Sequence, residues 1–234
     1  MLHMSRREFI TLLGGAAVAW PLSARAQQST MPVIGYLGSE SPDAFAGRLR
    51  AFRQGLSEAG YVEGKNLAVE YRWAENQYDR FPALLADLVR REVTVIVAVT
   101  GTPPVLAAKA ATTTIPIVFV TAGDPVALGL VASLSRPGGN LTGVATLTVE
   151  LGPKQLEVLR ELVPTATIIA LLVNPTNTTN AETLSRDLQS AARTIGLQLH
   201  VLHASTERDF DAVFASLPRL RASALVIGSD PFFQ

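Results

Sequence analysis

The feature of this chain that most limits its possible folds is an alternation, starting at Met31, of short β-branched runs with segments of helical periodicity. Residues 33–37 (VIGYL) and 93–99 (VTVIVAV) are almost wholly apolar, as expected of strands buried on both faces. Between such runs, residues 42–59 carry large apolar side chains at helical spacing until Gly60 ends the pattern. Strands that alternate with helices build parallel sheets, so the sequence predicts an α/β fold.

The same two patterns continue along the chain. The expected strands lie at residues 33–37, 67–73, 93–99, 115–120, 140–148, 167–173, 197–202 and 224–228. The expected helices lie at residues 42–59, 78–91, 103–111, 152–162, 181–195 and 207–217. One further helix is expected directly after Gly123-Asp124-Pro125, where a buried strand turns sharply.

The first residues have the features of an export signal. Arg6 and Arg7 form a basic front, Phe9 to Leu22 is an apolar run, and the segment ends in Ala24-Arg25-Ala26. The run is too short to favour a permanent membrane anchor, because a spanning helix needs about 20 apolar residues. The paired arginines favour the bacterial twin-arginine route over an ordinary secretory signal. We therefore expect residues 1–26 to be a cleaved twin-arginine-type signal peptide, cut near Ala26, which leaves no membrane anchor.

Charge and composition exclude several classes of function. The 20 basic and 20 acidic residues balance, so no electrostatic footprint for nucleic acid is visible. The chain has no cysteine, which excludes disulfides, thiolate metal sites and cysteine nucleophiles. His200 and His203 point to opposite faces of their expected strand. No phosphate-binding glycine loop or catalytic serine elbow occurs. We therefore expect no catalytic residues, no metal site and no cofactor, and the protein is not predicted to be an enzyme.

A small oxygen-bearing residue followed by proline recurs where the expected strands end. Such pairs are typical of a helix N-cap with proline at the first helical position. The pairs are Ser41-Pro42, Thr102-Pro103, Asp124-Pro125, Asn174-Pro175 and Asp230-Pro231. At Asn174-Pro175 a turn is expected instead, because Thr179 and Glu182 have the spacing of a capping box for the following helix.

These strand ends are also where a ligand site is expected. In a parallel sheet the carboxyl ends of the strands share one edge, at which open α/β folds bind ligands. Further small polar residues and glycines fall on this edge: Ser39, Thr100, Gly101, Thr121, Gly123, Asn177 and Thr178. Hydroxyls, amides and helix N-termini without many lysines or arginines suit a small polar ligand that bears a carboxylate. Helix capping alone would also explain each single residue.

Several turn sequences resemble one known family. GYLGSESP (35–42), GYVEGKN (60–66), GDPVALGLVASLSRPGGNLTG (123–143) and LLVNPTN (171–177) occur in the same order in the ABC transporter substrate-binding proteins that include tryptophan and tyrosine binders. The resemblance implies a type I periplasmic binding fold with two doubly wound parallel-sheet lobes. The N-terminal lobe is expected at residues 31–147 and the C-terminal lobe at 148–234. Because such relatives continue further, the second lobe is expected to be incomplete, truncated at its C-terminus.

The resemblance also implies a function and a set of site residues. The protein is expected to be a periplasmic component of an ABC importer that binds a small polar ligand, preferably an amino acid, and delivers it to a membrane permease. The ligand contacts carried over are Ser39, Thr102, Thr121, Asp124, Asn174 and Asp230. Asp124 is expected to cap its helix and Asp230 to meet a ligand ammonium group. A periplasmic sugar-binding or sensing protein and a periplasmic α/β enzyme remain the alternatives.

Overall fold

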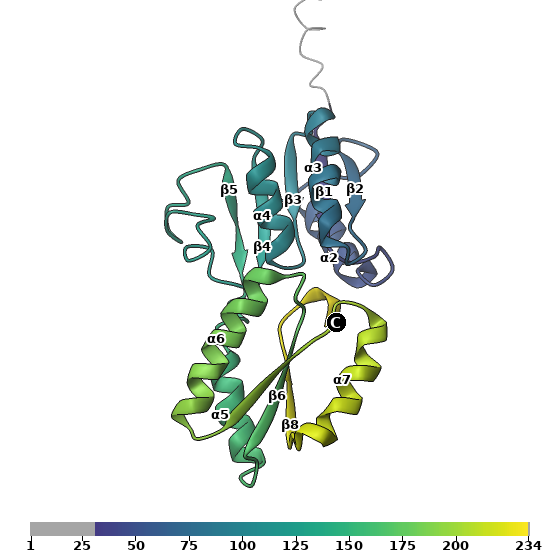
Figure 1. Cartoon of the computed structure of the whole chain (residues 1–234). Coiled ribbons are helices and arrows are strands. Elements are labelled where there is room, and N and C mark those ends of the chain that lie inside the picture. Colours follow the sequence, from purple (N-terminus) through teal and green to yellow (C-terminus); the bar gives the residue numbers. More distant parts are fainter. Residues whose placement is uncertain (1–30, 234) are drawn as a thin grey trace, which may run out of the picture. The chain divides into compact units, whose positions relative to one another are not determined.

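The computed structural model describes residues 31–233 and contains two parallel β-sheets flanked by helices (Figure 1). The signal peptide predicted at residues 1–26 lies outside the described residues. All six pairings between the named strands are parallel. The α/β prediction is confirmed, with the strands divided between two sheets and the second sheet the smaller.

The first sheet has five strands in the order β2-β1-β3-β4-β5. Its elements are β1 (Val33–Gly38), α2 (Ala46–Glu58), β2 (Ala68–Trp73), η1 (Tyr78–Arg80), α3 (Phe81–Arg90), β3 (Val95–Ala98), α4 (Thr102–Ala111), β4 (Ile117–Thr121) and β5 (Leu141–Ala145). The second sheet has three strands in the order β7-β6-β8. Its elements are α5 (Gly152–Leu162), β6 (Ile168–Val173), α6 (Thr178–Thr194), β7 (Gln198–His203), α7 (Glu207–Leu220), β8 (Ala224–Ile227) and η2 (Pro231–Phe233).

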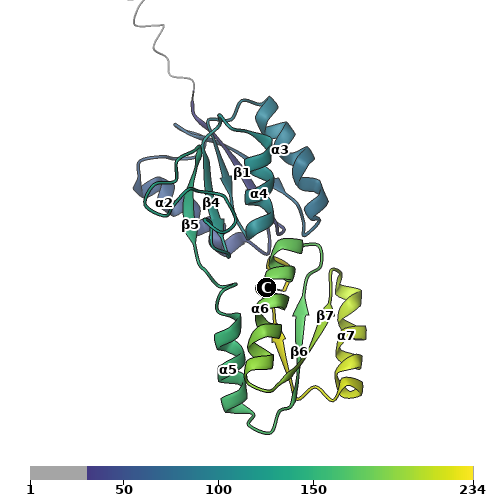
Figure 2. The ribbon, with the colours of Figure 1, turned by 60° about the vertical axis from the view of Figure 1, so that its left-hand side comes forward.

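Successive side chains of the central strands point to opposite faces of the first sheet, so the sheet has a hydrophobic core on each face. Ile34 and Tyr36 of β1 pack with Phe45 and Leu49 from α2 and the turn before it. Leu37, from the same strand, belongs to the opposite core. That second core contains side chains of α3 and α4, so helices cover both faces of the sheet (Figure 2). Burial on both faces explains why these strands are continuous apolar runs in the sequence.

The second sheet is covered on both faces in the same way. Ile169 and Leu171 of β6 pack with Leu156 of α5 and Leu188 of α6. Leu172, which points to the other face, packs with Val213 of α7 and with the residues that follow β8. Both groups of strands are therefore doubly wound, as predicted.

The helix predicted after Asp124 is wrong. Residues 125–129 form turns instead of a helix. The amide of Leu130 returns to the carbonyl of Pro125 at 2.8 Å, and Gly129 adopts φ +64°. This left-handed residue reverses the backbone after one turn and buries Leu130 and Val131 in the first core. Burial of these two side chains opposes continuation of the helix.

Some predicted caps are also wrong. Thr102 is the first residue of α4, with Gly101 at the N-cap, and Asn177 rather than Thr179 precedes α6. Residues 42–45 form a turn, so α2 begins later than predicted. The capping box lies instead at α7, between Thr206 and Asp209. Asn174 does form the predicted turn, accepting a hydrogen bond from the amide of Thr176 at 3.1 Å.

Candidate functional site

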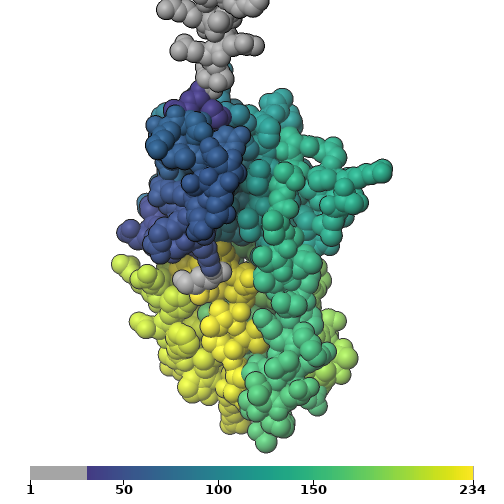
Figure 3. Space-filling model, turned by 180° about the vertical axis from the view of Figure 1, so that it is seen from behind, coloured from purple at the N-terminus to yellow at the C-terminus, as the bar shows by residue number. Residues whose placement is uncertain are grey.

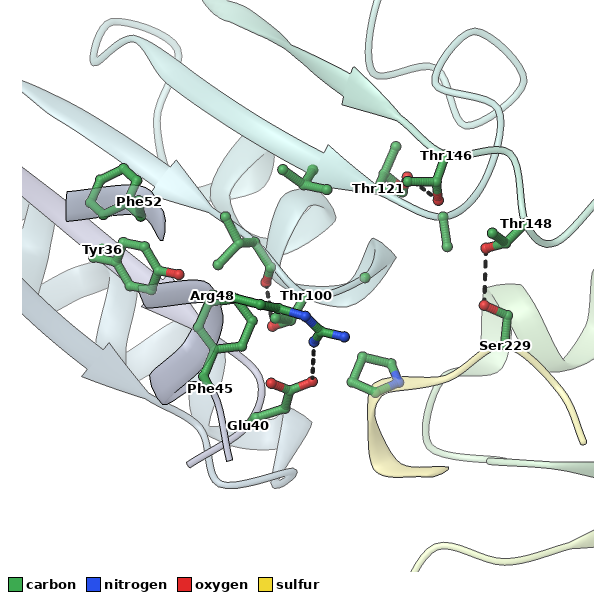
Figure 4. Close-up of a pocket in the computed structure, with 15 residues that line it drawn as sticks. Tyr36, Glu40, Phe45, Arg48, Phe52, Thr100, Thr121, Thr146, Thr148 and Ser229 are labelled. Carbon is green, nitrogen blue, oxygen red and sulfur yellow. Dashed lines mark hydrogen bonds and ion pairs between the residues drawn. The ribbon is translucent and has the colours of Figure 1, made fainter. Parts of the chain in front are cut away.

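A cavity of about 510 Å³ lies at the carboxyl ends of β1, β3 and β4. Its wall comes from the first sheet and α2, and Ser229 and Pro231 from the loop after β8 close it from the second lobe. The cavity therefore lies at the edge of the sheet where the sequence predicts a ligand site. Figure 4 shows the aromatic side chains at one end and Thr148 and Ser229 at the other.

The aromatic end of the cavity is formed by Tyr36, Phe45 and Phe52. The ring of Tyr36 lies 5.1 Å from that of Phe52 and 6.3 Å from that of Phe45, measured between centroids. Burial raises the pKa of Tyr36, so its hydroxyl stays protonated. Tilted rings at these distances form a rigid apolar wall suited to a flat or aliphatic group.

Glu40 and Arg48 place an ion pair in the wall of the same cavity. Nη1 of Arg48 donates to Oε1 of Glu40 at 3.3 Å, and the guanidinium lies 5.4 Å from the centre of the Phe45 ring. The side chain of Glu40 is 6% exposed, whereas that of Arg48 is 59% exposed. Burial raises the pKa of Glu40, and the guanidinium of Arg48 lowers it in part. A buried acidic oxygen therefore faces a mostly apolar cavity.

Hydroxyl groups line the remaining wall. The lining hydroxyls come from Thr100, Thr121, Thr146, Thr148 and Ser229. Thr148 and Ser229 are hydrogen-bonded to each other at 3.0 Å and so connect the link between β5 and α5 with the loop after β8. Side chains that both donate and accept can bind either end of a polar ligand.

The backbone at the end of β3 is held in an uncommon conformation. Thr100 has φ +66°, which is rare for a β-branched residue. Its hydroxyl accepts from the amide of Ser39 at 2.7 Å, and the hydroxyl of Ser39 donates to the carbonyl of Thr100 at 2.8 Å. The next residue, Gly101, has φ +100°, and a Cβ there would stand 3.1 Å from Pro231. Such strain is typical of functional sites, where surrounding contacts maintain it.

The six predicted ligand contacts are only partly brought together. Thr121 lines the cavity. Ser39 and Thr102 are fully buried next to it, Ser39 bonded to Thr100 and the hydroxyl of Thr102 lying 3.1 Å from that of Thr121. Asp124 lies outside the lining and accepts from the amides of Val126 and Ala127 at 2.8 and 3.3 Å.

Asn174 and Asp230 lie together in the second lobe, in a separate buried network. Oδ1 of Asp230 accepts from the hydroxyl of Tyr78 at 3.0 Å and from Nδ2 of Asn174 at 2.9 Å. Oδ2 accepts from Nδ2 of Asn177 at 2.7 Å, and the amide of Phe232 also donates to Oδ1. Burial raises the pKa of Tyr78 and the Asp230 carboxylate raises it further, so the phenol remains a donor. Asp230 thus joins the two lobes, whose contact is visible in Figure 3.

The sequence did not indicate Glu40, Arg48 or the aromatic wall as site residues. Phe45 and Phe52 fit the apolar face of a helix and were expected in its core. The available signal was that Phe45, Arg48 and Phe52 lie at helical spacing directly after GYLGSES, so a strand end and a helix face converge there. Among residues 31–233, no group of three or more His, Cys, Asp or Glu side chains could hold a metal ion.

No helix within the described part of the protein is long and apolar enough to cross a membrane. Residues 40–230 match the profile of a family described as ABC transporter substrate binding protein. The sequence is 30% identical over 169 residues to a protein named "Tyrosine-binding protein" from Clostridioides difficile, covering 72% of this chain and 48% of that protein. The chain thus spans about half the length of this curated relative.

Solved structures of similar proteins have the same fold. A conserved domain protein from Vibrio cholerae has a TM-score of 0.73 at 27% identity, and the match covers 84% of this protein and 64% of that one. An ABC domain from Streptococcus pneumoniae in complex with L-Trp has a TM-score of 0.71 at 21% identity, covering 86% and 66% of the two proteins. The likeness to the second structure shows the fold, and the resemblance inferred from the turn sequences is confirmed. The two sheets correspond to the lobes of the type I periplasmic binding fold.

Proposed function

Because the chain belongs to the ABC transporter substrate-binding protein family, we propose that it binds an amino acid in the cavity between its lobes and delivers it to an ABC permease outside the cytoplasm. The observation that carries this proposal is one cavity that combines an aromatic wall, an acid–base pair and several hydroxyls. A free amino acid presents an ammonium group, a carboxylate and a side chain within that small volume. In the cavity, Glu40 could bind the ammonium group, Arg48 the carboxylate, and the aromatic rings the side chain of the ligand.

The character of the similar proteins supports an amino acid rather than a sugar. One relative is named for binding tyrosine, and one structure of the same fold holds L-Trp. The rings of Tyr36, Phe45 and Phe52 would pack against such side chains. We therefore propose an aromatic amino acid as the first ligand to test.

The location outside the cytoplasm is part of the proposal. It rests on the family and on the export signal expected at residues 1–26, which would be cleaved near Ala26. The lobe boundaries, residues 31–147 and 148–234, stay predictions as well. The predicted boundary falls in the link between β5 and α5.

Among the predicted ligand contacts, Thr121 is the one that lines the cavity, and Ser39 and Thr102 would act by holding Thr100 and Thr121 in place. The predicted contact between Asp230 and a ligand ammonium group would require Asp230 to exchange one of its present protein donors for the ligand. The expected roles of Asp124 and Asn174 in binding likewise stay predictions.

The direct test is titration calorimetry of the purified protein against the common amino acids and a set of monosaccharides. We expect saturable binding of at least one aromatic amino acid and a thermal shift that grows with its concentration. Ligand at about 100 times its dissociation constant should add about 2.7 kcal/mol of stability. Binding of sugars alone would favour the sugar-binding alternative, and chemical conversion of the bound ligand would favour the enzyme alternative.

A further inference from the structure

The least satisfied polar atom in the cavity is Oε2 of Glu40. It is buried and has no hydrogen-bond partner, whereas Oε1 accepts from Arg48 at 3.3 Å. Among the described residues, only one other buried side-chain atom, Oδ1 of Asn76, shares this state, and Asn76 does not line the cavity. Buried carboxylate oxygens are normally hydrogen-bonded, so this oxygen is open to a donor supplied by a ligand in the cavity.

The position of Glu40 defines the character of that donor. Its neighbours in the wall include Tyr36, Phe45 and Arg48, and the carboxylate lies at the aromatic end of the cavity (Figure 4). In a poorly solvated site a cationic donor gains more from a carboxylate than a neutral hydroxyl does. An ammonium group attached close to an apolar or aromatic side chain fits both features.

The ion pair as a whole favours a zwitterion over a simple cation. Arg48 already offsets part of the negative charge of Glu40. In a ligand with an ammonium group near Glu40 and a carboxylate near Arg48, each charge would face a protein group of opposite charge. Such complementarity gives specificity, because a ligand that lacks the ammonium group leaves the buried carboxylate of Glu40 without a matching charge.

We propose that Oε2 of Glu40 accepts the ammonium group of the ligand and thereby makes the cavity selective for amino acids over their desamino analogues. This inference rests on the proposed function, since it concerns the same cavity. It assigns the ammonium contact to the first lobe, and Asp230 keeps its place in the network with Tyr78.

The charged and titratable groups around Glu40 give the expected pH dependence. They are Arg48 from α2, Tyr36 from β1 and Tyr78 from η1. Burial raises the pKa of Glu40 above its ordinary value of 4.5. An ammonium group binds the ionised carboxylate, so affinity should fall as the pH is lowered through this raised pKa. The stability of the empty protein should show the opposite trend, because a buried carboxyl of raised pKa destabilises the fold once it ionises.

The test compares two series of probes on the purified protein. One series is L-tyrosine, 3-(4-hydroxyphenyl)propionate and tyramine, and the other is L-tryptophan, indole-3-propionate and tryptamine. Glu40→Gln removes the charge at nearly constant shape. Glu75→Gln is the matched control, because Glu75 forms a 3.2 Å ion pair with Arg80 and does not line the cavity.

We expect the wild type to bind the amino acid of at least one series about 30-fold more tightly than its desamino acid. Glu40→Gln should weaken binding of that amino acid by about 30-fold and leave binding of the desamino acid nearly unchanged. Glu75→Gln should behave like the wild type. Because Glu40→Gln relieves a buried charge, its thermal midpoint without ligand should equal or exceed that of the wild type at pH 7.

The outcomes separate the two proposals. If the wild type binds none of the common amino acids, the proposed function fails and this inference fails with it; if it binds only another amino acid, the same comparison with that amino acid and its desamino acid decides the assignment to Glu40. If the wild type binds an amino acid and Glu40→Gln keeps the same preference over the desamino acid, only the assignment to Glu40 is overturned. Equal affinity of the wild type for an amino acid and its desamino acid would mean that the ammonium group gains nothing from Oε2, and would also overturn it.

Discussion

The loops at Asp124 and Asp230 have nearly the same sequence, Gly-Asp-Pro and Ser-Asp-Pro, and follow their strands at the same distance. Both aspartates make the same local contact. Oδ1 of Asp124 accepts from the amide of Val126 at 2.8 Å, and Oδ1 of Asp230 accepts from the amide of Phe232 at 3.0 Å. The short sequence therefore specifies one type of turn in both lobes.

The surroundings of the two turns differ. Asp124 is partly exposed, and the other donor to its carboxylate is the amide of Ala127. Asp230 is 4% exposed and also accepts from Tyr78, Asn174 and Asn177. The same turn is thus a local cap in one lobe and the centre of a buried network in the other. Residues distant in sequence decide which of these it becomes.

Replacing Asp230 by alanine should have the largest effect on stability. It would leave the side-chain donors of Tyr78, Asn174 and Asn177 without their acceptor, which should cost about 3 kcal/mol of unfolding free energy. Urea denaturation monitored by tryptophan fluorescence would measure this loss. Asp230→Asn is the matched control, because it keeps one acceptor oxygen and should lose less. A loss below about 1 kcal/mol in the alanine variant would remove the distinction between the two loops.

Removing the hydroxyl of Tyr78 should have an intermediate effect. Tyr78→Phe keeps the stacked contact with Phe81, whose ring centroid lies 5.7 Å away, and loses only the bond to Asp230. A hydrogen bond to a charged acceptor should contribute about 1.5 kcal/mol. Tyr61→Phe serves as the control, since Tyr61 is 46% exposed. In an Asp230→Ala background the same change should cost almost nothing, and a full additional loss there would refute the pairing.

The smallest effect is expected at Asp124. Asp124→Ala removes a cap on a partly exposed turn and should cost about 1 kcal/mol. Asp124→Asn should restore most of it, because the amide oxygen can accept the same bond. The measurement is again the urea midpoint. A loss as large as that of Asp230→Ala would mean that the two turns contribute equally to stability after all.

The layers of this fold could be predicted from the sequence because β1, β3 and β6 are buried on both faces and appear as continuous apolar runs. The prediction of a helix after Asp124 was wrong because it used only the residues next to the turn. Gly129 reverses the backbone there, and burial of Leu130 and Val131 stabilises the reversal. Contacts with residues distant in the sequence overrode the local helix propensity, and a short stretch of sequence does not reveal such contacts.

A cavity lies at the edge of the sheet where the sequence predicts a ligand site, but the residues that line it are only partly the predicted ones. Thr121 is a small polar residue at the end of a strand and was predicted for that reason, whereas Glu40, next to Ser41-Pro42, was not predicted as a ligand contact. Phe45 and Phe52 have the spacing of core residues, and the same spacing builds the cavity wall. The apolar spacing of a helix is the same whether its residues pack on the sheet or line a cavity beyond the edge of the sheet. The spacing alone therefore cannot tell core residues from cavity residues.

The bond between Tyr78 and Asp230 joins residues 152 positions apart in the sequence. Closing a flexible loop of that length would cost about 4 kcal/mol of conformational entropy, several times the net value of one hydrogen bond. The bond therefore cannot draw the two ends together by itself. Packing within the two sheets must bring the two residues together first. The hydrogen bond therefore stabilises the assembled lobes but does not drive their assembly.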